Sequence, residues 1–86
     1  MDTNLKPFMN IPPGEFILEE IESRGWSQRD LADIICETPK YVNDLISGKL
    51  SVSAKSAKQL AAAFGQSPEY WMNLQNNYNL RKEKHV

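Results

Sequence analysis

Apolar residues recur along this chain every three or four positions, in short blocks separated by glycine, proline and small polar residues. Such spacing predicts amphipathic helices, because it gathers the apolar side chains on one face of each helix. Five helices and no strands account for the whole pattern. We therefore expect a single all-α domain over residues 13–80, with a flexible leader over residues 1–12 and a charged tail over residues 81–86.

The first helix is predicted from about residue 13 to residue 24, with Ile17, Leu18 and Ile21 facing inward and Gly25 as its terminator. A fourth helix follows Ser53, which is a suitable N-cap, and places Ala57, Leu60, Ala61 and Phe64 on one face.

The fifth predicted helix, about residues 68–80, begins at a Ser67–Pro68 pair and is unusually rich in apolar and aromatic residues. Trp71, Leu74 and Tyr78 recur on one face, where they either close the core or form a dimer interface. Apolar residues outside that face indicate a second buried surface, and dimerisation is the simplest explanation. We therefore expect a homodimer.

Residues 27–48, SQRDLADIICETPKYVNDLISG, predict two short helices joined by a tight turn. Ser27 and Asp30 are spaced for a capping box, and Leu31, Ile34 and Ile35 then repeat at helical spacing. The pattern restarts with Thr38 as N-cap and Pro39 at the first helical position, and it stops at Gly48. The inward stripe of this helix, about residues 38–47, consists of Val42, Leu45 and Ile46.

The outward residues of this helix are polar and lie near its start, which is typical of a helix that enters the DNA major groove. Lys40 can donate to guanine O6 and N7, and Asn43 can pair with adenine. Tyr41 can touch a thymine methyl group or bind a phosphate. Asp44 either accepts from cytosine N4 or pairs within the protein. The expected phosphate contacts around this helix are Thr38, Ser47, Lys49 and Lys55.

The formal net charge of −1 counts against DNA binding, but the charges are unevenly distributed. Residues 14–37 hold seven acidic residues against two arginines, whereas residues 38–58 hold four lysines against Asp44 alone. The chain thus separates an acidic first helix from a basic second half, and a local basic face is what phosphate attraction needs.

The sequence gives little support for a membrane protein, a secreted protein, a metal-binding protein or an enzyme. No segment is apolar enough over the length that a membrane helix needs, and the first residues lack the pattern of a secretion signal. The single cysteine excludes an internal disulfide framework and fits the cytoplasm. One histidine and one cysteine cannot build a metal site of the usual kind, and no phosphate-binding loop or nucleophile motif occurs. We expect no enzyme activity, no cofactor and no small-molecule substrate.

The quoted helix-turn-helix segment resembles that of phage-repressor-like (Xre/Cro) regulators. More specifically, PPGEFILEEI and SPEYWMNLQNNYNL resemble the opening and closing segments of the short HigA antitoxins, also called the VapI type. The resemblance covers about residues 12–80 and implies a five-helix, phage-repressor-like fold. It also implies that Gln28 binds a backbone phosphate and braces the recognition helix. Many relatives have glycine in the turn, where this chain has Cys36–Glu37, so positive φ there predicts strain or a different turn geometry.

The resemblance further implies an antitoxin that neutralises a RelE-like (HigB-type), mRNA-cleaving toxin and represses their shared operon through a palindromic operator. A basic, RNA-binding toxin would be complementary to the acidic first helix, so Glu15, Glu19 and Glu22 are candidate toxin contacts. Two alternatives stay open. One is a repressor without a toxin, and the other is a protein-interaction module that has lost DNA binding.

Overall fold

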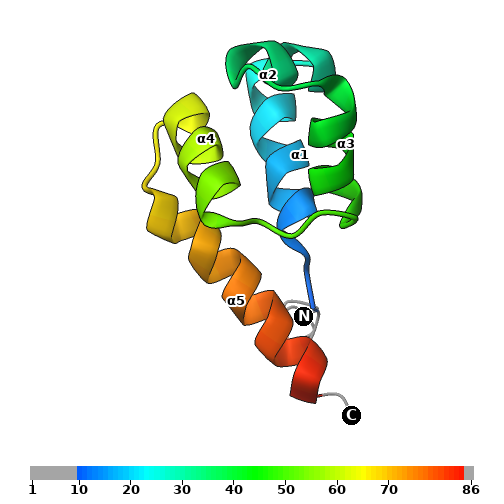
Figure 1. Ribbon diagram of the computed structural model, residues 1–86, viewed down its shortest axis with the longest axis vertical. Coiled ribbons are helices and arrows are strands. Elements are labelled where there is room, and N and C mark those ends of the chain that lie inside the picture. The colour runs from blue at the N-terminus through cyan, green and yellow to red at the C-terminus, as the bar shows by residue number, and fades with distance from the viewer. Residues whose placement is uncertain (1–9, 85–86) are drawn as a thin grey trace, which may run out of the picture.

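Five α-helices and no strand make up the part of the chain that the structure describes (Figure 1). The computed structural model describes residues 10–84, with side chains as far as residue 82. Most of the expected leader therefore lies outside the described residues, as does the end of the expected tail. The helices are α1 (Pro13–Arg24), α2 (Gln28–Ile34), α3 (Pro39–Ser47), α4 (Ala54–Phe64) and α5 (Pro68–Lys84).

The helix starts follow the predicted caps. The Ser27 hydroxyl accepts from the backbone N–H of Asp30, whose carboxylate accepts from the Ser27 N–H at 2.8 Å. Thr38 caps α3 by accepting from the N–H of Tyr41, and Ser53 caps α4. α1, α3 and α4 end at glycines in the left-handed conformation, as their positions predict. Local sequence thus sets most of the helix boundaries.

The core lies where α1 packs against α3 and α5, with α2 against α3 and α4 against α5. Its fully buried apolar side chains come from all five helices: Ile17, Leu31, Ala32, Val42, Ala57, Leu60 and Trp71. Three residues that the periodicity predicts to face inward are less buried than expected. Ile34 is 46% exposed at the end of α2, while Leu18 and Ile46 are only partly buried. The short α2 has room for one inward turn, which Leu31 and Ala32 fill.

Gly14 allows the first turn of α1 to rest directly on the end of α3. A Cβ atom at this position would lie 2.0 Å from the backbone oxygen of Ile46 and 2.7 Å from its carbonyl carbon. Real Cβ atoms do not approach backbone that closely, so any side chain here forces the two helices apart.

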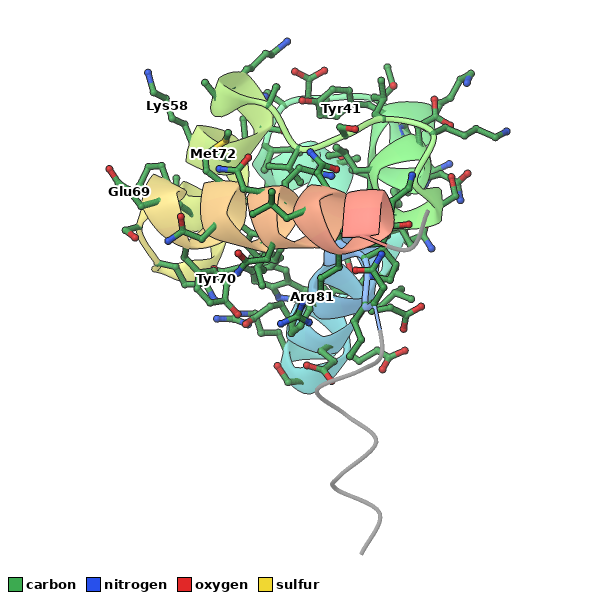
Figure 2. All side chains as sticks on the ribbon, turned by 90° about the horizontal axis from the view of Figure 1, so that it is seen from below. Tyr41, Lys58, Glu69, Tyr70, Met72 and Arg81 are labelled. Carbon is green, nitrogen blue, oxygen red and sulfur yellow. The ribbon has the colours of Figure 1, made fainter. Side chains whose placement is uncertain are left out.

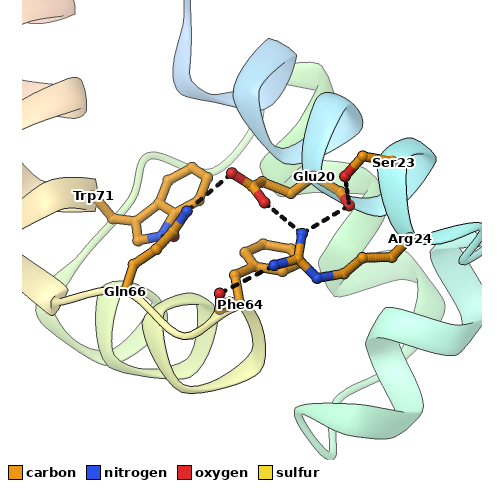
Figure 3. Close-up of polar contacts among 6 residues, drawn as sticks. All are labelled: Glu20, Ser23, Arg24, Phe64, Gln66 and Trp71. Carbon is orange, nitrogen blue, oxygen red and sulfur yellow. Dashed lines mark hydrogen bonds and ion pairs between the residues drawn. The ribbon is translucent and has the colours of Figure 1, made fainter.

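A polar network joins α1 to the connection between α4 and α5 (Figure 3). Glu20 forms an ion pair with Arg24 and accepts a hydrogen bond from the Gln66 amide at 2.9 Å. Gln66 in turn accepts from the Trp71 indole N–H at 2.6 Å, and Arg24 donates to the Phe64 carbonyl at 3.1 Å. The buried Trp71 therefore has a partner for its only polar atom.

The last helix is longer than predicted. α5 continues to Lys84, through most of the expected tail, and Figure 1 shows its final turns extending past the other helices. Trp71 is fully buried within one chain and so belongs to the core, whereas Leu74 and Tyr78 remain partly exposed. None of the described helices combines the length and the apolar character that crossing a bilayer requires.

Candidate nucleic-acid interface

α2 and α3 are joined by a tight turn that contains the expected left-handed residue. Cys36 has φ 60°, and among the described residues no other non-glycine residue has a positive φ. The turn is closed by backbone hydrogen bonds from Cys36 N–H to the Asp33 carbonyl at 3.2 Å and from Glu37 N–H to the Ala32 carbonyl at 2.9 Å. The positive φ predicted for the turn is therefore present, and it falls on a residue with a Cβ atom.

The outer face of α3 presents the predicted reading residues, though not all of them freely. Lys40 and Asn43 are exposed, and so are Thr38 and Ser47 at the two ends of the helix. Tyr41, expected to face outward, is instead half-buried and packs against the core. In Figure 2, Tyr41 and Lys58 lie on one side of α5, and Tyr70 and Arg81 lie on the other.

Asp44 is paired within the protein. Its carboxylate accepts a hydrogen bond from the Lys40 ammonium at 2.9 Å, one turn away on α3. The Lys40 side chain is 80% exposed and that of Asp44 only 15%. The lysine therefore covers the acid, and the pair presents an ammonium group outward.

The start of α2 braces α3 at the middle of its outer face. The Asn43 side-chain amide donates to the side-chain oxygen of Gln28 at 3.4 Å. This contact uses one amide hydrogen of Asn43 and the oxygen of Gln28, so each side chain keeps donor capacity for a ligand. This hydrogen bond joins Gln28 to the recognition helix, and the phosphate contact of Gln28 stays a prediction.

Tyr41 belongs to a chain of side-chain contacts that leads to α4. Its hydroxyl donates to Gln59 Oε1 at 2.8 Å, and Gln59 Nε2 donates to Glu37 Oε2 at 2.9 Å. Because the Glu37 carboxylate can only accept, Gln59 must turn its oxygen toward Tyr41. The Tyr41 hydroxyl thus donates its hydrogen bond within the protein, and toward a ligand it can act only as an acceptor.

Glu37 also binds Lys55, with 3.2 Å between carboxylate oxygen and ammonium nitrogen. The hydrogen bond from Gln59, followed by the contact with Lys55, lowers the pKa of Glu37 below its ordinary value of 4.5. Lys55 lies 5.6 Å from the centre of the Tyr41 ring. Sequence reasoning missed Glu37 and Gln59 as members of this face, since the pairs lie 18 and 22 residues apart and no local pattern connects them.

The predicted phosphate-binding residues lie around α3. Thr38, Ser47, Lys49 and Lys55 are all exposed, and Gln28 is partly exposed. Thr38 accepts the cap hydrogen bond and keeps its own hydroxyl hydrogen, whereas the Ser47 hydroxyl is directed back to the Asp44 carbonyl at 3.4 Å. Lys58 on α4 is exposed on the same side as Tyr41 (Figure 2) and adds a further cation there.

The acidic residues of α1 form a separate face. Glu15, Glu19 and Glu22 are exposed, while Glu20 is held in the network of Figure 3. Burial raises the pKa of Tyr70, as do the nearby charges of Glu20 and Glu19. Tyr70 therefore lies close to the acidic residues, on the side of α5 opposite Tyr41 (Figure 2).

Comparison with known sequences places this arrangement among regulators. Residues 17–71 match the helix-turn-helix family. The chain is 35% identical over 68 residues to antitoxin HigA-1 of Vibrio cholerae, which covers 78% of this chain and 64% of that protein. It is 32% identical to the uncharacterised transcriptional regulator YddM of Escherichia coli, over 79% of this chain and 72% of the relative.

Solved structures show the same likeness. An addiction-module antidote protein of the HigA family from Coxiella burnetii has 34% identity and a TM-score of 0.80, over 85% of this chain and 80% of that one. Antitoxin HigA of Pseudomonas aeruginosa, solved with the higBA promoter, has 32% identity and a TM-score of 0.82, over 87% of this chain and 83% of that one. The two chains share their fold with the protein described here.

Proposed function

The chain belongs to the HigA/VapI-type antitoxins of the helix-turn-helix family, which are not enzymes, and from this premise we propose that it represses its own operon and neutralises a toxin. The observation that carries the DNA-binding part is the outer face of α3, where Lys40 and Asn43 are exposed and Asn43 is hydrogen-bonded to Gln28 of α2. The Pseudomonas relative that was solved with promoter DNA supports it.

In this proposal the start of α3 enters the major groove, and two copies of the chain read half-sites about 10 bp apart, or a multiple of that, on a palindromic operator. Lys40 donates to guanine, and Asn43 pairs with adenine. Tyr41, whose hydroxyl hydrogen is already used, accepts from an amino group of cytosine or adenine. Asp44 accepts from cytosine N4.

The surroundings of α3 supply the phosphate contacts in this proposal. The proposed contacts are Gln28, Thr38, Ser47, Lys49 and Lys55. Such contacts position the protein on the duplex and carry little sequence information, so their loss weakens all sequences alike.

A gel-shift assay with the chain's own promoter region tests DNA binding. Lys40→Ala and Asn43→Ala should each weaken operator binding by roughly 1–3 kcal/mol at the bases they read. Asn76→Ala is the matched control, because Asn76 is exposed on α5, and this variant should bind as the unaltered chain does. Binding should also fall steeply as salt rises. Absence of a shift at low salt would contradict the proposal and favour the interaction module.

Toxin neutralisation is assigned to the acidic face of α1. Glu15, Glu19 and Glu22 are exposed on α1, a different helix from the one that carries the reading residues, so a basic, RelE-like ribonuclease could bind while the DNA-binding face stays open. A small basic protein encoded next to this chain is the expected partner. Without such a gene, the repressor that acts alone would be the better description.

Charge reversal tests the toxin face. The triple change of Glu15, Glu19 and Glu22 to lysine should weaken toxin binding by at least tenfold, because it replaces attraction with repulsion. The measurement is calorimetric titration against the co-expressed toxin. Changing Asn76 of α5 to lysine adds positive charge on another side of α5 and should leave toxin affinity nearly intact. Equal toxin affinity in both variants would show that the acidic face of α1 does not bind the toxin.

A further inference from the structure

Two carboxylates lie beneath the lysines that surround α3. Asp44 is covered by Lys40 at 2.9 Å, and Glu37 is paired with Lys55 at 3.2 Å. In both pairs the lysine side chain is the exposed partner, at 80% and 68%, whereas the acids are 15% and 21% exposed. Lys40 and Lys55 are therefore locally neutralised before any DNA arrives.

Both carboxylates have partners within the protein. Glu37 also accepts from Gln59 at 2.9 Å, and Gln59 is held from the other side by the Tyr41 hydroxyl at 2.8 Å. Asp44 lies one helical turn from its lysine, so the two side chains are neighbours on the same face. Neither acid can turn away from a DNA backbone without breaking contacts within the protein.

A carboxylate on a DNA-binding face affects different DNA sequences unequally. It repels every phosphate, so it lowers the sequence-independent attraction that makes up non-specific binding. In the cognate complex a base amino group can donate to Asp44, and Lys40 and Lys55 stay ordered as donors. Opposite a wrong base, the carboxylate loses water and gains no donor.

We propose that Glu37 and Asp44 are specificity-determining residues that suppress binding to non-cognate DNA more strongly than binding to the operator. This inference rests on the proposed DNA binding and extends it to residues whose charge opposes DNA. The two acids reduce affinity in general, and in exchange they raise the ratio of operator binding to non-specific binding, which governs occupancy in a genome.

The test uses Glu37→Gln and Asp44→Asn, which remove one negative charge each and nearly keep the side-chain shape. Fluorescence anisotropy with a duplex of random sequence should show binding that is about three- to tenfold tighter for each variant at roughly 0.1 M salt. The slope of log K against log salt should steepen, because Lys55 or Lys40 is then free to neutralise a phosphate. The ratio of operator affinity to random-duplex affinity should fall.

Glu69→Gln is the matched control, since Glu69 is exposed at the start of α5, on a different face, and its change alters net charge equally. It should leave the random-duplex affinity within twofold of the unaltered chain. Thermal unfolding of all three variants establishes that each is folded. If Glu37→Gln and Asp44→Asn strengthen random-duplex binding no more than Glu69→Gln does, net charge alone explains the effect and the proposal is overturned.

An equal gain on operator and random DNA would also overturn it, because the ratio would then be unchanged. Failure of the proposed function looks different. In that case the unaltered chain shows no preference for its promoter region over the random duplex, whatever the variants do.

Discussion

Gly14 is a single residue on which the packing of α1 against α3 depends. The position is buried, and the carbonyl group of Ile46 occupies the space that a Cβ atom would need. Glycine is required here because of a close approach between two backbones, since the residue itself lies in an ordinary helix. The glycine that follows the two prolines is therefore explained by a contact with α3, more than thirty residues away along the chain.

Gly14→Ala should lower the free energy of unfolding by about 2–4 kcal/mol, because the added methyl group has to push α1 off α3. Urea denaturation followed by circular dichroism measures the change. The neighbouring, exposed Glu15→Ala should stay within about 0.5 kcal/mol of the unaltered chain. A Gly14→Ala protein as stable as the Glu15→Ala protein would show that the two helices can separate at little cost.

Single residues also show where sequence reasoning stops. The outward positions of Lys40 and Asn43 follow from helical periodicity and are confirmed. Tyr41 was expected to face outward too, but it leans toward α4 because Gln59 and Lys55 approach it from there. Such contacts depend on how α4 is placed in space, which periodicity along one helix cannot reveal.

At the scale of the helices, the turn between α2 and α3 contains a strained backbone conformation. Cys36 adopts φ 60°, a conformation that costs a residue with a Cβ atom roughly 1–2 kcal/mol relative to glycine. The turn nevertheless sets the angle between α2 and α3 and hence the position of Asn43 against Gln28. Hydrogen bonds from Cys36 and Glu37 to the end of α2 hold it closed.

Cys36→Gly should raise the free energy of unfolding by roughly 0.5–1 kcal/mol, after allowance for the greater freedom of glycine in the unfolded chain. Cys36→Ala keeps the strain while removing the thiol, so it should change stability little. Parallel urea titrations of the two variants separate the effect of backbone conformation from that of the sulfur atom. An equal gain in both would assign the effect to the thiol instead of to φ.

The helix boundaries were largely predictable because local chemistry sets them. Ser27, Thr38 and Ser53 cap helices as expected, and Gly25, Gly48 and Gly65 end them. The end of α5 was predicted too early. No glycine or proline follows Leu80, and residues 81–84 consist only of good helix formers, so nothing local stops the helix there.

At the scale of the whole molecule, the protein has more apolar surface on α5 than one chain buries. Tyr70 is 38% exposed, and Leu74, one turn further along the same face, is half-buried. We propose that this face pairs with that of a second copy, which would place two recognition helices on one palindromic operator.

Leu74→Glu should abolish the dimer at micromolar concentration, because it places a charge in an apolar contact. Leu80→Glu is the control. Leu80 is 61% exposed and lies about 120° around the helix from Leu74, so that variant should dimerise normally. Sedimentation equilibrium measures the association, and circular dichroism establishes that both variants keep their helices. A Leu74→Glu protein that still dimerises would move the interface to another face.

The two tryptophans of the chain stand on either side of Phe64. Each ring centre lies 5.9 Å from that of Phe64, and the indole N–H of Trp71 is bound to Gln66. Both tryptophans thus lie at the same junction of α1, α4 and α5. The outer face of α3 is not part of this junction. The intrinsic tryptophan fluorescence of this protein therefore reports on the packing of the core. The emission should stay nearly constant when DNA is added.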